Sequence, residues 1–340
     1  MSYEFLQTLW YVLIAILWIG FFFLEGFDFG VGMLLPFLGK KDEERRAIIN
    51  TIGSTWDGNE VWLLTAGGAT FAAFPHWYAT MFSGFYLALF LLLVGLIMRG
   101  VSFEYRSKDP NPKWRHTFDW MIAVGSFLAS LLLGAAFANL ARGVPINENM
   151  MFTGNLFTLL NPYGLLGGVT TVFIFLLHGA NFLGLKLQDE LRERVNIAAK
   201  RIWIITTVLY IILAASTYIA GFWARNRIDP GVVPVAAVAA LLVAGYFVNQ
   251  KREGWAFIMG ALNIVLTQVT FFGMNFPNVM ISTTNPAYNL TIYNASSSQY
   301  TLTVMSIVAL IFVPIVLAYQ GWSYYMFRKR VSTDTKTLTY

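Results

Sequence analysis

Long apolar segments recur along the chain and constrain its fold more than any other feature. A helix needs roughly 20 apolar residues to cross the hydrocarbon core of a bilayer. Because 57% of the residues are hydrophobic and 12% are charged, against about 25% charged in soluble domains, we predict an all-α integral membrane protein. Residues 1–340 are expected to form a single polytopic membrane domain. Its nine predicted transmembrane helices are 6–38, 56–75, 78–99, 117–141, 162–186, 201–224, 231–249, 254–274 and 301–327.

The lysines and arginines orient these helices, because such residues gather in cytoplasmic loops. With the N-terminus outside, 20 of the 23 lysines and arginines fall in the inner loops and the C-terminal tail. The other three are Arg142, Arg225 and Arg227. We therefore expect the N-terminus outside and the C-terminus in the cytoplasm. The net charge of +5 follows this topology and does not indicate a nucleic-acid partner.

Two stretches place carboxyl groups within apolar segments. The first reads Glu25-Gly-Phe-Asp28-Phe-Gly-Val-Gly, and the second reads Trp-Asp57-Gly-Asn-Glu60-Val-Trp. In each stretch the two acids are three residues apart and share one helix face. A charge at bilayer depth is costly, so it should face a protein interior, find a partner or be protonated.

The third predicted helix ends on the inner side at Arg99, and Glu104 follows it closely. Five acids and one arginine are therefore expected to converge near the cytoplasmic side. This pattern favours a proton route or a polar site for the head group of a lipid-soluble ligand. The alternative is structural: Asp57 and Glu60 would complement a helix dipole, and Arg99 would be a snorkelling anchor.

The chain has no cysteine and three histidines, His76, His116 and His178. Disulfides and thiolate sites are therefore excluded, and neither a metal site nor a haem is expected in this chain alone. We expect His178, in the inner half of the fifth helix, to make a structural hydrogen bond. His116 and Asp119 are predicted to be cap and boundary residues of the fourth helix.

Gly26 and Gly30 are four residues apart, a spacing that lets a second membrane helix approach closely. Acids and glycines at membrane depth are also typical of proton-coupled secondary transporters, which place their sites near the midplane. Here the acids lie toward one side of the membrane, which disfavours a transporter. A purely structural membrane scaffold is a third alternative.

Short motifs extend from the first segment to the last. They are Glu25-Gly-Phe-Asp28-Phe-Gly30-Val-Gly32, Trp56-Asp57-Gly58-Asn59-Glu60-Val61-Trp62, Ala66-Gly67-Gly68-Ala69, Phe74-Pro75, Phe82-Ser83-Gly84-Phe85-Tyr86, Arg99, Phe103-Glu104-Tyr105-Arg106-Ser107-Lys108, Gly154-Asn155, Leu160-Asn161-Pro162, Ser297-Ser298-Gln299 and Leu302-Thr303-Val304-Met305. Together they resemble subunit II of the cytochrome bd quinol oxidases, over nearly the whole chain.

The resemblance implies a non-haem large subunit of a terminal oxidase in the bacterial plasma membrane. Such an enzyme oxidises quinol and reduces O2 to water. Subunit I, the partner, is expected to hold two b-type haems, one d-type haem and the quinol oxidation site. A small single-helix subunit and membrane lipid are further expected partners. The implied fold has two four-helix bundles plus one peripheral helix.

The resemblance also assigns roles to individual residues. Asp57 and Glu104 match acids on a proton path from subunit II toward the haems. Asp28 and Arg99, together with Asp57, match a polar site near a quinone of structural role in some members. Trp62 matches an aromatic residue near a proposed oxygen route.

The expected proton path is Asp57, Glu104, Glu25, Asp28 and Glu60. Some members have aspartate where this chain has Glu25 and Glu104, which keeps the acid and changes its reach. No catalytic residue is expected in this chain itself, because the redox centres are expected in subunit I.

Overall fold

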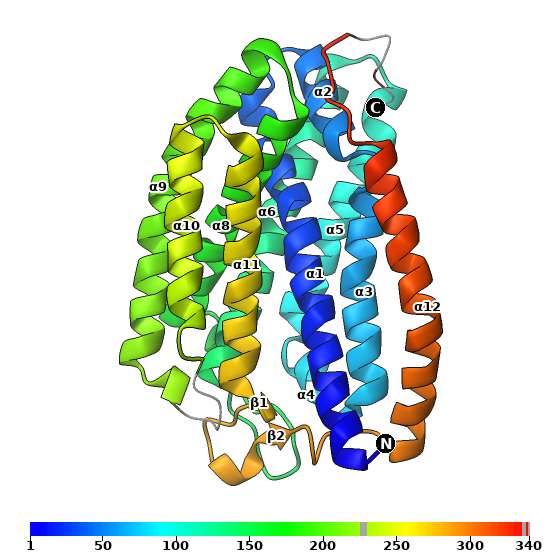
Figure 1. Cartoon of the computed structure of the whole chain (residues 1–340), viewed down its shortest axis with the longest axis vertical. Helices are drawn as coiled ribbons and strands as arrows, with labels where there is room; N and C mark the ends of the chain where they lie inside the picture. The colour runs from blue at the N-terminus through cyan, green and yellow to red at the C-terminus, as the bar shows by residue number, and fades with distance from the viewer. Residues whose placement is uncertain (225–229, 335–337, 339–340) are drawn as a thin grey trace.

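The computed structural model describes residues 1–224, 230–334 and 338, and most of these residues are helical. Figure 1 shows the long helices side by side, with the N-terminus and the C-terminus near opposite ends of the molecule. Arg225, Arg227 and Lys336, which were counted for the topology, lie outside the described residues. In chain order the elements are α1 Tyr3–Leu38, α2 Asp42–Ile52, α3 Trp56–Ala73, α4 Pro75–Gly84, α5 Tyr86–Tyr105, η1 Arg106–Lys108, α6 Pro112–Arg142, α7 Leu156–Leu159, α8 Pro162–Lys186, α9 Asp189–Ile219, η2 Phe222–Ala224, α10 Val233–Asn249, α11 Glu253–Asn275, β1 Asn278–Met280, η3 Pro286–Tyr288, β2 Leu290–Thr291 and α12 Gln299–Met326.

The predicted helix at 78–99 is wrong as a single helix. Pro75 begins α4, because its fixed φ suits the first helical position and its missing N–H costs nothing there. Phe85 then separates α4 from α5, and α5 continues to Tyr105. Arg99 therefore lies within α5 and not at its end.

Two further differences concern the ends of the helices. The helix α9 begins at Asp189 and not at 201, because the basic stretch after α8 is itself helical. The helix α2 and the antiparallel pair β1–β2 occupy segments where no element was predicted. Both are short and lie at the ends of the long helices (Figure 1), where hydropathy carries little information.

Among the described residues, seven helices are long and apolar enough to cross a membrane: α1, α5 with η1, α6, α8, α9, α11 and α12. The helix α10 is apolar but shorter, with 17 residues. The helix α3 carries Asp57, Asn59 and Glu60 near its start, which lowers its hydropathy. The seven helices make this a multi-pass membrane protein, while the count of nine spans remains a prediction.

The helix α1 lies at the centre of the packing and contacts α3, α6, α8 and α11. It meets α8 where Gly30 faces Gly179, and a Cβ on Gly30 would overlap the carbonyl oxygen of Phe175. A Cβ on Gly26 would lie 2.7 Å from the ring of Phe175. The predicted close approach at Gly30 is therefore present, and small residues permit it.

The helix α12 lies at the edge of the molecule (Figure 1) and buries one residue, Leu302. Near its start, Trp10 Nε1 of α1 donates a hydrogen bond to the carbonyl oxygen of Leu302 at 3.1 Å. Near its end, Gln320 and Tyr324 contact Asn59 of α3. These contacts hold α12 against the α1–α3 side, where the candidate site lies.

Candidate functional site

A buried charged cluster joins α1, α3 and α5. The side chains of Glu25 and Arg99 are both fully buried, and Arg99 Nη1 donates a hydrogen bond to Glu25 Oε1. The same Nη1 donates to Glu60 Oε2 at 3.3 Å, and the Glu60 side chain is 23% exposed. Three helices thus bring two of the predicted acids onto one arginine.

Aromatic rings surround the guanidinium of Arg99. Its Cζ lies 4.9 Å from the ring centroid of Phe29, 5.2 Å from that of Phe103 and 5.8 Å from that of Trp56. Such rings attract a cation electrostatically and keep water away from it. The structural alternative of a snorkelling arginine is wrong, because the Arg99 side chain is fully buried and paired with Glu25.

Asp28 is connected to α3 and α12 through the side-chain amide of Asn59 and the hydroxyl of Tyr324. Asn59 Nδ2 donates a hydrogen bond to Asp28 Oδ2 at 2.7 Å. Asn59 Oδ1 in turn accepts hydrogen bonds from Tyr324 OH at 2.7 Å and from Gln320 Nε2 at 3.3 Å. The chain of contacts thus runs from α1 through α3 to α12.

Several buried polar atoms of this cluster have no hydrogen-bond partner among the described residues. They are Glu25 Oε2, Asp28 Oδ1, Arg99 Nε and Arg99 Nη2. Buried polar groups normally have at least one partner, and an unsatisfied one usually marks a water, an ion or a functional role. Glu25 and Asp28 are also close enough to repel each other when both are ionised.

Asp57 and Glu104 lie outside the buried cluster. Both are exposed in this chain, and Asp57 Oδ1 accepts a hydrogen bond from the backbone N–H of Gly58 at 2.8 Å. Their neighbours Trp56 and Phe103 contact each other, with 5.0 Å between ring centroids. The two acids therefore lie at adjacent helix ends, and the fold brings the other three predicted acids, Glu25, Asp28 and Glu60, close to Arg99.

Trp62 is half-buried on the face of α3 that meets α1, and a Cβ on Gly20 would overlap its ring. Its Nε1 donates a hydrogen bond to Gln320 Oε1 at 3.0 Å. Sequence reasoning gave no role to Gln320, Tyr324 or Asn59. An amide in the apolar last segment was the available signal for Gln320, since such a group needs a partner.

His178 is buried between α1 and α11. Its Nε2 donates a hydrogen bond to the carbonyl oxygen of Phe23 at 3.1 Å, and its ring stacks on Phe257 with centroids 4.6 Å apart. The predicted structural hydrogen bond is present, and His178 Nδ1 has no partner among the described residues. The described residues contain no group of three or more His, Asp or Glu that could hold a metal ion.

A second ionic network lies at the end of the molecule that carries α2. Asp119 is fully buried, and its carboxylate accepts hydrogen bonds from Arg106 Nε at 2.5 Å and Arg45 Nη1 at 2.9 Å. Arg106 also pairs with Asp42 at 2.9 Å. The expectation that His116 and Asp119 cap the fourth predicted helix is wrong, because α6 begins at Pro112 and Asn111 is its N-cap. Asp119 instead joins α2, η1 and α6.

Glu44 of α2 is a titratable group outside the membrane-spanning helices. Burial raises the pKa of its carboxyl, but hydrogen bonds from Arg194 and from the backbone N–H groups of Lys40 and Lys41 outweigh burial and lower the pKa below its usual range. The charged form therefore stabilises the contact between α2 and α9.

A bundle of apolar helices around a buried arginine and its acids defines a polytopic membrane protein with an internal charged site. The family model described as cytochrome bd terminal oxidase subunit II matches residues 6–327. The chain belongs to this family and is a subunit of a cytochrome bd-type terminal oxidase, an oxidoreductase complex of the respiratory chain. This result favours the oxidase prediction over a transporter.

Curated relatives match along nearly their full lengths. Cytochrome bd ubiquinol oxidase subunit 2 of Bacillus subtilis is 44% identical, with 96% of this chain and 97% of the relative covered. Cytochrome bd-I ubiquinol oxidase subunit 2 of Escherichia coli is 39% identical, with 98% and 97% covered. A chain in the structure of bd oxidase from Geobacillus thermodenitrificans superposes with a TM-score of 0.77, covering 95% of this chain and 98% of that one. Since that chain is 14% identical in sequence, the likeness concerns the fold alone.

Proposed function

We propose that this subunit supplies a proton route toward the oxygen-reducing centre of the complex. The observation that supports the proposal is the charge balance of the buried cluster. Glu25, Asp28 and Glu60 are three carboxyl groups near one cation, Arg99. Carboxylates that share a site cannot all ionise cheaply, so the cluster favours holding at least one proton.

The proton would enter at the exposed acids and reach the cluster over one helical turn. Asp57 and Glu104 are the entry groups in this proposal, and Glu60 connects them with the interior because its side chain is partly exposed and also bonds to Arg99. Asn59, Gln320 and Tyr324 position Asp28. The unpartnered atoms of Glu25 and Asp28 would be satisfied by water, which can carry a proton between them.

The buried polar atoms that lack a hydrogen-bond partner also support a second role for the cluster. Asp28 and Arg99 would bind the head group of a structural quinone, with Asp57 at the rim. A quinone carbonyl accepts hydrogen bonds, and Arg99 Nε and Nη2 are buried donors without a partner among the described residues. The oxygen route beside Trp62 is proposed from the family resemblance alone.

The reaction of the whole complex, its other subunits and the membrane topology are proposed from the family resemblance. The complex oxidises quinol and reduces O2 to water. The relatives are named ubiquinol oxidases, which indicates ubiquinol as their quinol. Subunit I holds the two b-type haems and the d-type haem, and a small single-helix subunit can accompany it. The chain crosses the bacterial plasma membrane nine times as two four-helix bundles plus the peripheral α12, with its N-terminus outside and its C-terminus in the cytoplasm.

The experiment replaces the entry acid Asp57 and the connecting acid Glu60 by the corresponding amides. In Asp57→Asn the amide oxygen can still accept the Gly58 N–H, so the complex should assemble with its haems while quinol-driven O2 consumption slows. A tenfold loss corresponds to about 1.4 kcal/mol of barrier. Glu60→Gln should slow turnover in the same way, because the amide keeps the size and cannot carry the proton.

Glu43→Gln is the matched control, because Glu43 is an exposed acid of α2 at the same end of the molecule. It should leave both haem content and O2 consumption unchanged. Full turnover in assembled Asp57→Asn and Glu60→Gln would leave these acids with a structural role and would support a purely structural subunit.

A further inference from the structure

A pocket of about 440 Å³ lies where α8 and α12 end, at the end of the molecule that carries α2. Figure 1 shows α11 and α12 on either side of α1, and residues of all three helices line the pocket. The acids Glu25, Asp28 and Glu60 do not line it. Its volume falls in the range of about 300–1,000 Å³ that is typical of small-molecule sites.

The described residues that line this pocket include two cations and no acid. The cations are Lys186, the last residue of α8, and Arg328, which follows the end of α12. Neither pairs with a carboxylate in the part of the chain that the structure describes. At the same end of the molecule, Arg106, Arg115 and Arg194 each pair with an acid. A pocket lined by charges of one sign attracts a ligand of the opposite sign, so this pocket favours an anion.

The backbone after α12 brings the two cations together. Lys186 Nζ donates hydrogen bonds to the carbonyl oxygens of Phe327 and Lys329, the second at 3.4 Å. Because these two residues flank Arg328 in the chain, the ammonium group is held next to the residue that carries the guanidinium. Arg328 Nη1 donates to the carbonyl oxygen of Tyr325. An ammonium group has three N–H donors and a guanidinium has five, so both keep donors for a ligand.

An apolar wall lies beside the cations. Phe182 is one helical turn before Lys186 on α8, and Lys186 Nζ lies 5.9 Å from the centroid of its ring. The ring of Phe182 stacks on Phe27 of α1 with 4.1 Å between centroids, and Phe23 and Phe257 line the same pocket. The charged groups therefore lie at one end of an apolar wall, as the phosphate and the acyl chains of a phospholipid require. A free phosphate ion would make no use of this wall.

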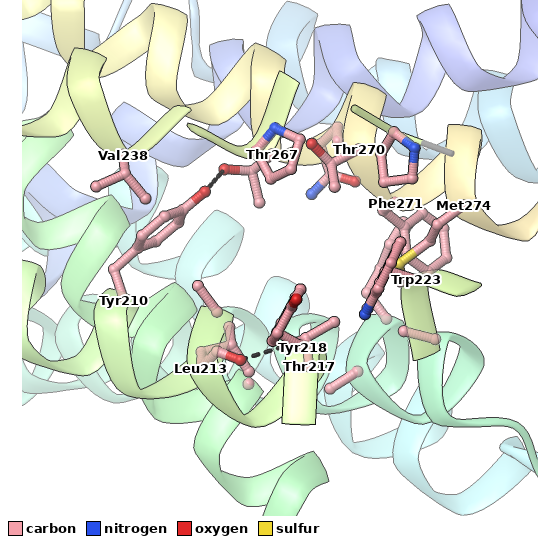
Figure 2. Close-up of a pocket in the computed structure, with 18 of the residues that line it drawn as sticks. Tyr210, Leu213, Thr217, Tyr218, Trp223, Val238, Thr267, Thr270, Phe271 and Met274 are labelled. Carbon is pink, nitrogen blue, oxygen red and sulfur yellow. Dashed lines mark hydrogen bonds between the residues drawn. The ribbon is translucent and has the colours of Figure 1, made fainter. Parts of the chain in front are cut away.

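A second cavity, of about 600 Å³, shows how much the two cations matter. Figure 2 shows its wall, which includes Tyr210, Thr267 and Phe271. None of the described residues that line this cavity is charged, so a phosphate would be buried there without a counter-charge. An anionic lipid therefore fits the pocket at Lys186 and Arg328 and not this cavity.

We propose that the pocket at Lys186 and Arg328 binds an anionic phospholipid, with its phosphate at the two cations and an acyl chain against the apolar wall. Arginine can bind a phosphate through two parallel N–H groups, and lysine binds it as a point charge. Basic pockets between membrane helices on the cytoplasmic side are typical sites for anionic head groups. A zwitterionic head group carries a cation of its own, which the two cations would repel. The proposal does not depend on whether the buried acids carry protons.

The test uses the purified complex and a phosphatidylglycerol that carries a diazirine near the head-group end of one acyl chain. After irradiation and peptide mapping, the label should fall on α1, α8 or α11 of this chain, at the positions that line the pocket. Excess phosphatidylglycerol should suppress the label. Excess phosphatidylcholine should suppress it far less, and inorganic phosphate should leave it unchanged.

Two variants change the pocket in different ways. Lys186→Gln/Arg328→Gln should weaken the labelling about 25-fold, at about fivefold for each cation near an anionic lipid. Leu185→Trp fills the pocket without changing its charge and should abolish the label. The matched control is Lys40→Gln/Lys329→Gln, which removes two exposed cations that do not line the pocket. This control should label as the wild type does.

Several outcomes would overturn the proposal. In the wild type, a label that maps outside the pocket would do so, and this result needs no variant to assemble. Equal labelling of the wild type and the assembled Lys186→Gln/Arg328→Gln complex would do so as well. Equal suppression by phosphatidylcholine and phosphatidylglycerol would show that the cations do not select the lipid. Suppression by inorganic phosphate would identify a site for the free ion instead.

Discussion

At the scale of single residues, Arg99 determines the character of the buried site. Among the residues that the structure describes it is the single cation in direct contact with Glu25 and Glu60, and three aromatic rings cover it. Removing one partner of a buried ion pair is costly because the other charge stays buried. The arginine is therefore what allows acids to persist inside an apolar bundle.

Arg99→Leu should weaken assembly of the complex by about 3–5 kcal/mol, because Glu25 loses its partner. The measurement is the yield and melting temperature of the haem-containing complex. The double variant Arg99→Leu/Glu25→Leu should recover part of the loss, since it removes both charges. A single variant that assembles normally and melts at the wild-type temperature would contradict this role.

Glu44 gives a prediction about pH. Its pKa in the folded protein lies below the unfolded value of 4.5, so its stabilising effect is fully present above that pH and is lost as the pH falls through the folded pKa. Glu44→Gln should lower the melting temperature by a constant amount from about pH 7 to pH 5, and the difference should shrink at lower pH. A difference that does not change with pH would contradict the charge-based contact with Arg194.

The sequence located the acids of the site but not their partners. Glu25 and Asp28 stand out because charges in an apolar segment are rare. Tyr324 and Gln320 reach Asn59 across more than 260 positions of the chain, and no local pattern reports such a contact. Arg99 was placed at a helix end because hydropathy falls at the charge, whereas α5 continues to Tyr105.

At the scale of elements, glycine positions decide how closely the helices approach. The crossing of α1 and α8 depends on Gly30 and Gly179, whose backbones lie in contact. This was predictable, because the spacing of Gly26 and Gly30 is local. The break at Phe85 directly follows Ser83-Gly84, a dipeptide that is typical of turns, but the apolar residues on both sides led to the prediction of one helix.

Gly30→Ala should destabilise the complex by about 1–3 kcal/mol, because the added Cβ overlaps the backbone of α8. The matched control is Gly273→Ala on α11, where nothing lies within 4 Å of the added carbon. That change should be neutral or slightly stabilising, since alanine favours a helix by up to about 1 kcal/mol. Thermal unfolding of the two purified variants distinguishes them, and equal melting temperatures would reject the contact.

At the scale of the whole molecule, charged side chains and short loops lie at opposite ends of the helices. One end carries α2 and the network around Asp119. The other end carries the β1–β2 pair, where Val144 bridges to Ser282 and Ser282 Oγ donates to the carbonyl oxygen of Ile146 at 2.9 Å. The nine predicted helices leave two long connections on one side, 142–161 and 275–300, and these meet at one end of the molecule, as a common side of the membrane requires.

The last prediction concerns this arrangement in the membrane. A tag inserted at 284–287, where the chain is exposed, should be accessible from outside the cell. A tag beside Glu148 should report the same side, because the loop that carries Glu148 contacts the loop that carries residues 284–287. A reporter fused after Arg330 should read as cytoplasmic, since the positive-inside rule places the basic tail there and α12 separates it from the outer loop. Labelling of intact cells with an impermeant reagent makes the measurement, with permeabilised cells as the control. If the tags at 284–287 and after Arg330 report the same side, α12 does not cross the membrane and the nine-span topology is wrong.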